Sequence, residues 1–204
     1  MLENEITGTP RSLRAAGMIV LAVVSLPSCI VTETGEPVVN ESSASERLAS
    51  PVDQPPLDVE PFLNRPCEVL TPEQAAEWTV SSPERLPADR EYTGPACDFE
   101  PDDFNRVSFG IAVQTNGGLE RLYKRRDTLE LFEPTEVAGY PGAFYDTADR
   151  RAFGQCALTL GATEDKTLNV IVSVRDRESP EYADPCQVAE RIMQQMLETI
   201  GARS

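Results

Sequence analysis

The sequence has no histidine and only two lysines, Lys124 and Lys166. Without histidine the chain cannot build a Ser-His-Asp triad, a Cys-His nucleophile pair or a His-ligated metal site. No CxxC pair is present, so zinc is a minor alternative for the cysteines. Lys166 falls in a predicted turn, where nothing would desolvate its amine and lower its pKa for a Ser-Lys dyad. We therefore expect no enzyme activity, no catalytic residue, no cofactor and no bound metal.

Long apolar runs are also scarce. The one strongly apolar stretch, residues 15–26, is shorter than the roughly 20 residues that a membrane-spanning helix needs. It follows two arginines and has the length of a signal-peptide core. It ends in Leu26-Pro27-Ser28-Cys29, which resembles the bacterial lipobox, in which the cysteine is diacylated and becomes the new N-terminus.

These features predict that residues 1–28 are a lipoprotein signal peptide and that Cys29 carries the lipid. Two acyl chains give stable attachment, so we expect the protein on the outer leaflet of the cytoplasmic membrane, at its extracytoplasmic face. Two alternatives remain: an uncleaved signal anchor, or an ordinary secretory signal that leaves Cys29 as a free thiol.

Positive charge is scarce as well. The chain has 34 acidic residues against 18 lysines and arginines, a formal net charge of -16. Such a charge repels nucleic acid and anionic lipid headgroups, so neither is an expected partner. Because some pair among so many carboxylates will lie close together by chance, a glycosidase-type acid and base pair is only a minor candidate.

The region after Cys29 has the composition of a linker. Residues 29–61 are acidic, rich in serine and proline, and lack aromatic side chains. Such a segment cannot bury enough apolar surface to offset the entropy of ordering, so we predict a lipid-anchored disordered linker. Residues 62–204 form a single expected domain, which is long enough to build one core.

Four further cysteines lie in the predicted domain, at positions 67, 97, 156 and 186. An even number of cysteines in an exported domain predicts two disulfides, for which three pairings exist. We favour Cys67–Cys97 and Cys156–Cys186, because both close local loops of about 30 residues.

Two helices have clear start signals. Thr71 and Gln74 form a capping box that predicts a short helix over residues 72–78. Asp184 precedes a proline at the first helical position and an apolar face that recurs at three- and four-residue steps, which predicts a helix over residues 185–200. Both cysteine pairs place one member at or just before these helices.

The remaining elements predict a sheet. Residues 106–114 alternate as a half-buried strand, and residues 118–132 have apolar side chains near helical spacing before Pro134. We expect a long loop over residues 79–96 and further strands over residues 136–138, 143–146, 155–160 and 168–174, the last two joined by a hairpin turn. This order predicts an α+β domain, a mostly antiparallel sheet with packed helices.

Several motifs together resemble a known family. They are Pro66-Cys67-Glu68-Val69-Leu70-Thr71-Pro72-Glu73-Gln74-Ala75, Cys97-Asp98-Phe99 and Asp184-Pro185-Cys186, with the lipobox and the acidic linker. They are similar to the actinobacterial cell-envelope lipoproteins grouped as domain of unknown function 3558, over about residues 62–200. The resemblance implies a secreted, disulfide-bonded α+β lipoprotein of a Gram-positive actinobacterium. It implies no catalytic residues, because the family has no established activity.

Three groups of side chains are candidate sites. An acidic cluster could bind calcium, although a solvated strand end explains it equally well; its members are Asp98, Glu100, Asp102 and Asp103. The basic run Lys124-Arg125-Arg126 could bind an anionic polymer or an acidic partner, but such charges are more often a solvated helix face. Aromatic residues could line a ligand groove or simply pack in the core: Trp78 with Tyr92, and Tyr140 with Phe144 and Tyr145.

The combination of anchor, linker and disulfide-bonded domain favours a non-enzymatic surface lipoprotein whose domain binds a protein or an envelope component. The alternative is a carrier that holds a lipid or an apolar small molecule in a cavity between sheet and helices, which would require an enclosed apolar pocket. The sequence identifies neither the partner nor the ligand.

Overall fold

A computed structural model describes residues 47–87, 94–103 and 106–202 of the protein. The predicted signal peptide, Cys29, residues 30–46 of the predicted linker and Tyr92 lie outside the described residues. Within the described ranges, no helix is both long enough and apolar enough to cross a membrane.

The described strands form one antiparallel sheet of seven strands in the order β1-β2-β3-β7-β6-β5-β4. Their bounds are β1 Glu84–Leu86, β2 Ala96–Phe99, β3 Val107–Gln114, β4 Leu131–Val137, β5 Tyr140–Asp146, β6 Gln155–Gly161 and β7 Thr167–Val174. The predicted α+β class, with a mostly antiparallel sheet, is confirmed.

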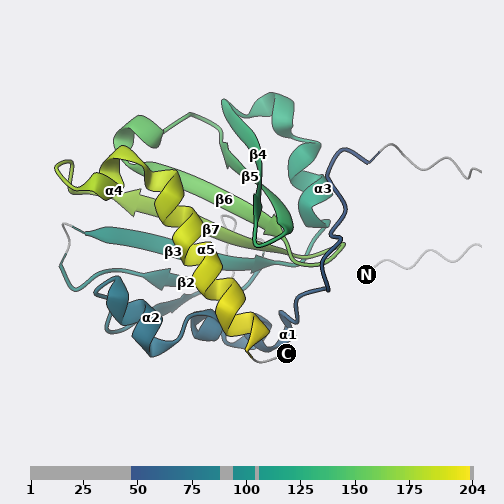
Figure 1. The fold of residues 1–204 in the computed structure, drawn as a ribbon. Helices are drawn as coiled ribbons and strands as arrows, with labels where there is room; N and C mark the ends of the chain where they lie inside the picture. The colour runs from purple at the N-terminus through teal and green to yellow at the C-terminus, as the bar shows by residue number, and fades with distance from the viewer. Residues whose placement is uncertain (1–46, 88–93, 104–105, 203–204) are drawn as a thin grey trace, which may run out of the picture. The chain divides into compact units, whose positions relative to one another are not determined.

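Helices pack on both faces of this sheet: α5 lies across one face (Figure 1), and α3 packs Leu119 and Tyr123 against Ala143 on the opposite face. The α-helices are α1 Glu60–Asn64, α2 Pro72–Glu77, α3 Gly118–Tyr123, α4 Pro180–Ala183 and α5 Pro185–Gly201. Short 3-10 helices are η1 Pro66–Val69, η2 Arg126–Thr128 and η3 Arg151–Phe153. The expected helices at residues 72–78 and 185–200 are present, while α1 and α4 were not predicted.

The core lies between α5 and the sheet. Helix α5 crosses the sheet and packs on β6 and β7 (Figure 1). Its buried apolar stripe includes Ile192, Met193 and Met196, each 0% exposed. On the sheet side, alternate residues of the two strands, such as Leu158 and Val170, are also 0% exposed. The apolar side chains that repeat every 3.6 residues along the helix therefore pack against those that repeat every two residues along the strands, in one apolar layer.

Strand β3 is buried on both faces, so the prediction of a half-buried strand is wrong. Val107 to Val113 are all buried, including Ser108 and Ala112 on the face turned away from α5. The reason is position, because β3 lies inside the sheet between β2 and β7.

The expected helix over residues 118–132 is also wrong in its second half. Helix α3 ends at Tyr123, and Leu131 begins strand β4. Pro134 lies inside this strand and does not terminate a helix. β4 is the last strand of the sheet, and an edge strand tolerates proline because one side of it needs no N–H donor. Likewise, the predicted long loop over residues 79–96 contains the short strand β1.

Contacts with the domain begin before residue 62, the predicted start of the domain. Residues 47–61, assigned above to the linker, run along the domain. The N–H of Leu57 donates to the carbonyl of Ala162 (3.1 Å), and Val59 is 1% exposed within the core. The carboxylate of Glu120 accepts hydrogen bonds from two backbone N–H groups near the start of this segment, both at 3.0 Å.

The structure contains the disulfides Cys67–Cys97 and Cys156–Cys186, the pairing that the local-loop argument favours. The first joins η1 to β2, and the second joins β6 to the first turn of α5. Each disulfide therefore fastens a helical segment to the sheet.

Candidate functional site

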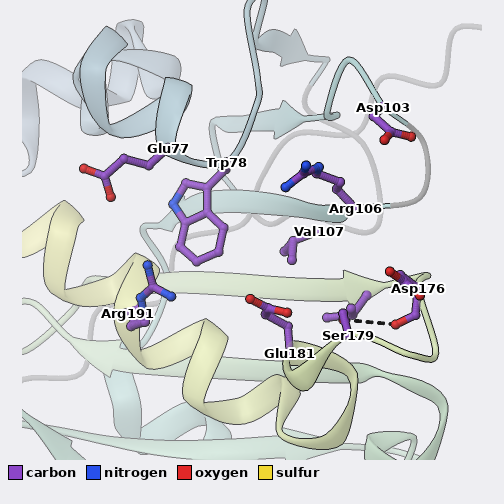
Figure 2. Close-up of a pocket in the computed structure, with 10 residues that line it drawn as sticks. Glu77, Trp78, Asp103, Arg106, Val107, Asp176, Ser179, Glu181 and Arg191 are labelled. Atoms are coloured by element: carbon purple, nitrogen blue, oxygen red, sulfur yellow. Dashed lines mark hydrogen bonds between the residues drawn. The ribbon is translucent and has the colours of Figure 1, made fainter.

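An open groove of about 360 Å³ lies where α2, α4 and α5 meet the ends of β3 and β7 (Figure 2). We call it the Trp78 groove. Its apolar floor contains Val107, the first residue of β3, and Val174, the last residue of β7. Its charged wall is formed by Glu77, Asp103, Arg106, Asp176, Glu181 and Arg191.

Trp78 is held firmly at the end of α2. Its ring packs edge-on against Phe109, with centroids 5.9 Å apart, and its indole N–H donates to Oε1 of Gln195 (2.8 Å). The guanidinium of Arg191 lies over the ring, 4.8 Å from its centroid (Figure 2). Because Trp78 is only 6% exposed, its ring offers little area for a ligand to stack on. Recognition in this groove therefore falls to the charged side chains.

The capping box at the start of α2 helps to fix the position of Trp78, which follows the last residue of that helix. Thr71 and Gln74 hydrogen-bond each other's backbone N–H groups, as predicted, and so fix the first turn of α2. The side chain of Gln74 also reaches α5, where its Nε2 donates to the carbonyl of Gln195 (3.1 Å) and its Oε1 accepts from Thr199 (2.8 Å). The local sequence signal thus docks α2 on α5 and sets one wall of the groove.

The charges of the groove are only partly compensated. Glu77 accepts a hydrogen bond from Nε2 of Gln195 (2.8 Å). Among the described residues, Arg106 and Glu181 form no ion pair, and they point into the groove from opposite walls (Figure 2). Four carboxylates face two guanidiniums in the lining. The groove therefore favours a charged ligand, and its excess of carboxylates favours cationic groups.

The predicted acidic cluster is dispersed. Its members are Asp98, Glu100, Asp102 and Asp103. Glu100 pairs with Arg175 (3.2 Å), Asp102 accepts from the hydroxyl of Ser81 (2.8 Å), and Asp103 lines the Trp78 groove. Within the described part of the chain, no three acidic or cysteine side chains are grouped so as to hold a metal ion. These four carboxylates therefore do not form a calcium site.

The three residues of the basic run Lys124-Arg125-Arg126 have different surroundings in the structure. Lys124 pairs with Glu120 (3.6 Å), and Arg126 pairs with Asp127 (3.7 Å), so both belong to the solvated face. Arg125 alone lines a pocket, on the other side of the sheet from α5. Lys166 is held by Glu60 (3.2 Å), and this hydrogen bond raises the pKa of its amine, opposite to the change a Ser-Lys dyad needs.

The aromatic candidates do not share one groove. The hydroxyl of Tyr140 donates to the carbonyl of Pro55 (2.9 Å), and Phe144 packs against the core. Tyr145, the next residue along β5, lines the pocket that contains Arg125. The predicted pairing of Trp78 with Tyr92 lies outside the described residues.

A third pocket, of about 550 Å³, lies beside the Cys67–Cys97 disulfide. It opens between η1, α2 and the end of β2, and its walls are mainly apolar, including Leu70, Ala75, Val80 and Phe99. It is thus bounded by helices and sheet, and its apolar wall residues belong to the same core cluster as the buried side chains of α5.

The sequence did not point to Arg106, Glu181, Arg191 or Gln195 as site residues. Gln195 lies 117 residues from Trp78, and no motif links the two positions. The one available signal was that Arg191 is the only basic residue of α5 and precedes Ile192 of its buried stripe, and an arginine beside a buried stripe is common in surface helices.

These features define a disulfide-bonded α+β domain with open, charged and apolar surface pockets. Residues 24–199 match the family model described as a protein of unknown function (DUF3558), and the chain belongs to this family. No curated protein matches the chain significantly.

Proposed function

We propose that the protein is a non-enzymatic, surface-anchored lipoprotein of an actinobacterium, and that its extracytoplasmic domain binds a protein of the cell envelope through the Trp78 groove. The observation that carries the proposal is the groove itself. It holds Arg106 and Glu181 without ion pairs among the described residues, over the apolar floor of Val107 and Val174 and beside a wall set by the capped helix α2.

The groove suits a protein segment better than a sugar. A sugar ring would need an open aromatic face, but the ring of Trp78 is covered by Arg191 and is almost fully buried. A segment with basic residues would match the excess of carboxylates, and an acidic residue beside them would reach Arg106. Opposite charges across such an open groove give specificity and a faster association rate.

The anchor supports this role. Lipid on Cys29 would hold the domain at the outer face of the cytoplasmic membrane, where the two disulfides are compatible with an oxidising environment. We expect native mass spectrometry of the protein, gently extracted from its own membranes, to find a diacylglyceryl mass on Cys29 and a deficit of four hydrogens. Cys29→Ala should abolish the lipid mass, and unchanged membrane attachment of a processed Cys29→Ala protein would contradict the anchor.

Photo-crosslinking in living cells tests the groove. A photoreactive phenylalanine at position 176, an exposed position in the groove lining, leaves Arg106 and Glu181 in place and should capture a discrete protein. Glu181→Arg in the same chain should reduce that capture. The matched control places the photoreactive residue at Glu136, which is exposed on the edge strand β4. Equal capture from positions 176 and 136, or capture that Glu181→Arg does not change, would contradict binding in the Trp78 groove.

A carrier of a lipid or an apolar small molecule is a second candidate, which would use the pocket beside the Cys67–Cys97 disulfide, although this pocket is open and is not the enclosed cavity expected above. Its volume falls in the range of small-molecule sites, and its lining is mainly apolar. In the same native mass spectra, a carrier would retain a noncovalent ligand that is lost in Ala76→Leu, because Ala76 is an exposed residue of the pocket wall. A spectrum without such a ligand would favour the protein-binding role.

A further inference from the structure

A pocket of about 290 Å³ lies on the face of the sheet turned away from α5. We call it the Tyr145 pocket. Ala157 of β6 and Ile171 of β7 are register partners in its floor. Their neighbour Leu158 packs in the core, and side chains alternate along a strand, so this floor faces the other way. Tyr145 and Leu129 complete the apolar lining.

A buried polar network stands against this pocket. The amide Nδ2 of Asn169 donates to the hydroxyl of Tyr145 (2.7 Å) and to Oγ1 of Thr159 (2.6 Å). Burial raises the pKa of the Tyr145 phenol, so it stays protonated at neutral pH and keeps a proton to donate. Asn169 is 1% exposed, and its Oδ1 has no partner in the described part of the chain. The hydrogen bond from Asn169 therefore fixes the position of the Tyr145 hydroxyl, which belongs to the pocket lining.

Two guanidiniums stand at the pocket. Arg150 is bound by both oxygens of Asp146, at 2.9 and 3.0 Å. Arg125 forms no ion pair with any described residue, and it lies close enough to Tyr145 to act on its hydroxyl electrostatically. The lining thus has two positive groups and one negative group, in a chain whose net charge is -16. The Trp78 groove has the opposite balance, four carboxylates to two guanidiniums.

From this arrangement we propose that the Tyr145 pocket binds a compact amphipathic anion, a molecule with an apolar ring or short chain and one carboxylate, sulfonate or phosphate group. Arg125 pairs with the anionic group, the Tyr145 hydroxyl donates a hydrogen bond to it, and the apolar part rests on Ala157 and Ile171. The volume is at the lower end of small-molecule sites, so the ligand is smaller than a two-chain lipid or a folded peptide. This site is independent of the Trp78 groove.

Calorimetry with a matched pair of probes tests the site. The full chain, reconstituted in phosphatidylcholine nanodiscs, is titrated with naphthalene-2-sulfonate and with its uncharged counterpart 2-naphthalenemethanol, against empty nanodiscs as the blank. We expect the sulfonate to bind. Arg125→Gln should weaken its binding on the order of tenfold, the size typical of one hydrogen bond to a charged group, and should leave the alcohol unaffected. Absence of sulfonate binding overturns the proposal.

Arg126→Gln is the charge control, because Arg126 belongs to the same basic run but pairs with Asp127 outside the pocket. Equal weakening by Arg125→Gln and Arg126→Gln would mean that the probe senses only overall charge, and would overturn the proposal.

Ala157→Leu should weaken both probes by filling the floor, whereas Ala76→Leu, in the wall of the pocket beside Cys67–Cys97, should weaken neither. The reverse result would place the probe in that other pocket and overturn the assignment. Thermal melting confirms that each variant is folded before it is titrated.

Discussion

The indole N–H of Trp78 donates a 2.8 Å hydrogen bond to Oε1 of Gln195, and so joins the end of α2 to the middle of α5. Nε2 of the same glutamine donates to Glu77, the last residue of α2. The Gln195 side chain therefore accepts the hydrogen bond of the Trp78 indole and also holds the Glu77 carboxylate in the wall of the Trp78 groove. The stability of α2 and the shape of the groove are coupled through this contact.

Removing this contact should destabilise the domain. Gln195→Ala leaves the nearly buried indole N–H of Trp78 without its acceptor, which costs about 1 to 3 kcal/mol of the free energy of unfolding. Gln194→Ala is the matched control, since Gln194 is exposed on the same helix and the change in helix propensity is the same. Urea unfolding of both variants measures the difference, and equal stabilities would show that the Trp78 contact contributes little.

The two disulfides should stabilise the domain separately. Each closes a loop with a sequence separation of 30 residues, and the chain-entropy model gives roughly 3 to 4 kcal/mol for a loop of this length. Cys67→Ala/Cys97→Ala and Cys156→Ala/Cys186→Ala should each lower the melting temperature, and reductant should lower that of the native chain further than either pair of substitutions. A melting temperature that reductant does not change would show that neither disulfide stabilises the domain.

Helix starts that depend on contacts within a few residues of the chain were predicted correctly from the sequence. Thr71 with Gln74 and Asp184 with its following proline fix helix starts through contacts within one turn, so the sequence was sufficient to predict them. Strand β4 was not predicted correctly from its local sequence. Its Phe132 fits helical spacing after α3, and only the pairing with β5 decides that the segment is extended. Such pairing is a tertiary contact that a single window of sequence does not contain.

Only some residues of the candidate sites were predictable from the sequence, and their arrangements were not. Trp78, Arg125 and Tyr145 were all singled out from the sequence, each in a different proposed group. The fold places Trp78 against Gln195 of a distant helix and brings Arg125 to Tyr145, since the chain turns back between α3 and β5. Contacts between residues so far apart in the sequence depend on the order of the strands in the sheet, and the sequence pattern alone did not predict that order.

The N-terminal segment before α1 should contribute to stability, in contrast to the role of a free linker. Val59 is almost completely buried, and burying a valine side chain is worth about 1.5 to 3 kcal/mol. A chain that begins at residue 62 should therefore unfold at a lower denaturant concentration than a chain that begins at residue 47. Val59→Ala in the longer chain should account for part of the loss. Equal midpoints for the two chains would restore the domain boundary at residue 62.

The ion pair between Asp146 and Arg150 should give the domain a specific sensitivity to acid. Burial alone would raise the pKa of Asp146, but hydrogen bonds from Arg150 and from the backbone N–H of Ala148 outweigh it, and the pKa lies below its ordinary value. A carboxyl whose folded pKa is depressed stabilises the fold above its unfolded pKa, near pH 4, and loses that contribution as the pH falls through the folded pKa.

Asp146→Asn should therefore cost about 1 to 3 kcal/mol of the free energy of unfolding at pH 7, and the deficit relative to the native chain should shrink below about pH 4. Urea unfolding of both proteins from pH 7 to pH 3 measures this difference directly. Asp127→Asn is the control, because the Asp127 side chain is 92% exposed and its replacement should stay within about 0.5 kcal/mol of the native stability at pH 7. A deficit of Asp146→Asn that grows toward acid pH would have the wrong sign and would show that the depressed pKa of Asp146 does not stabilise the fold.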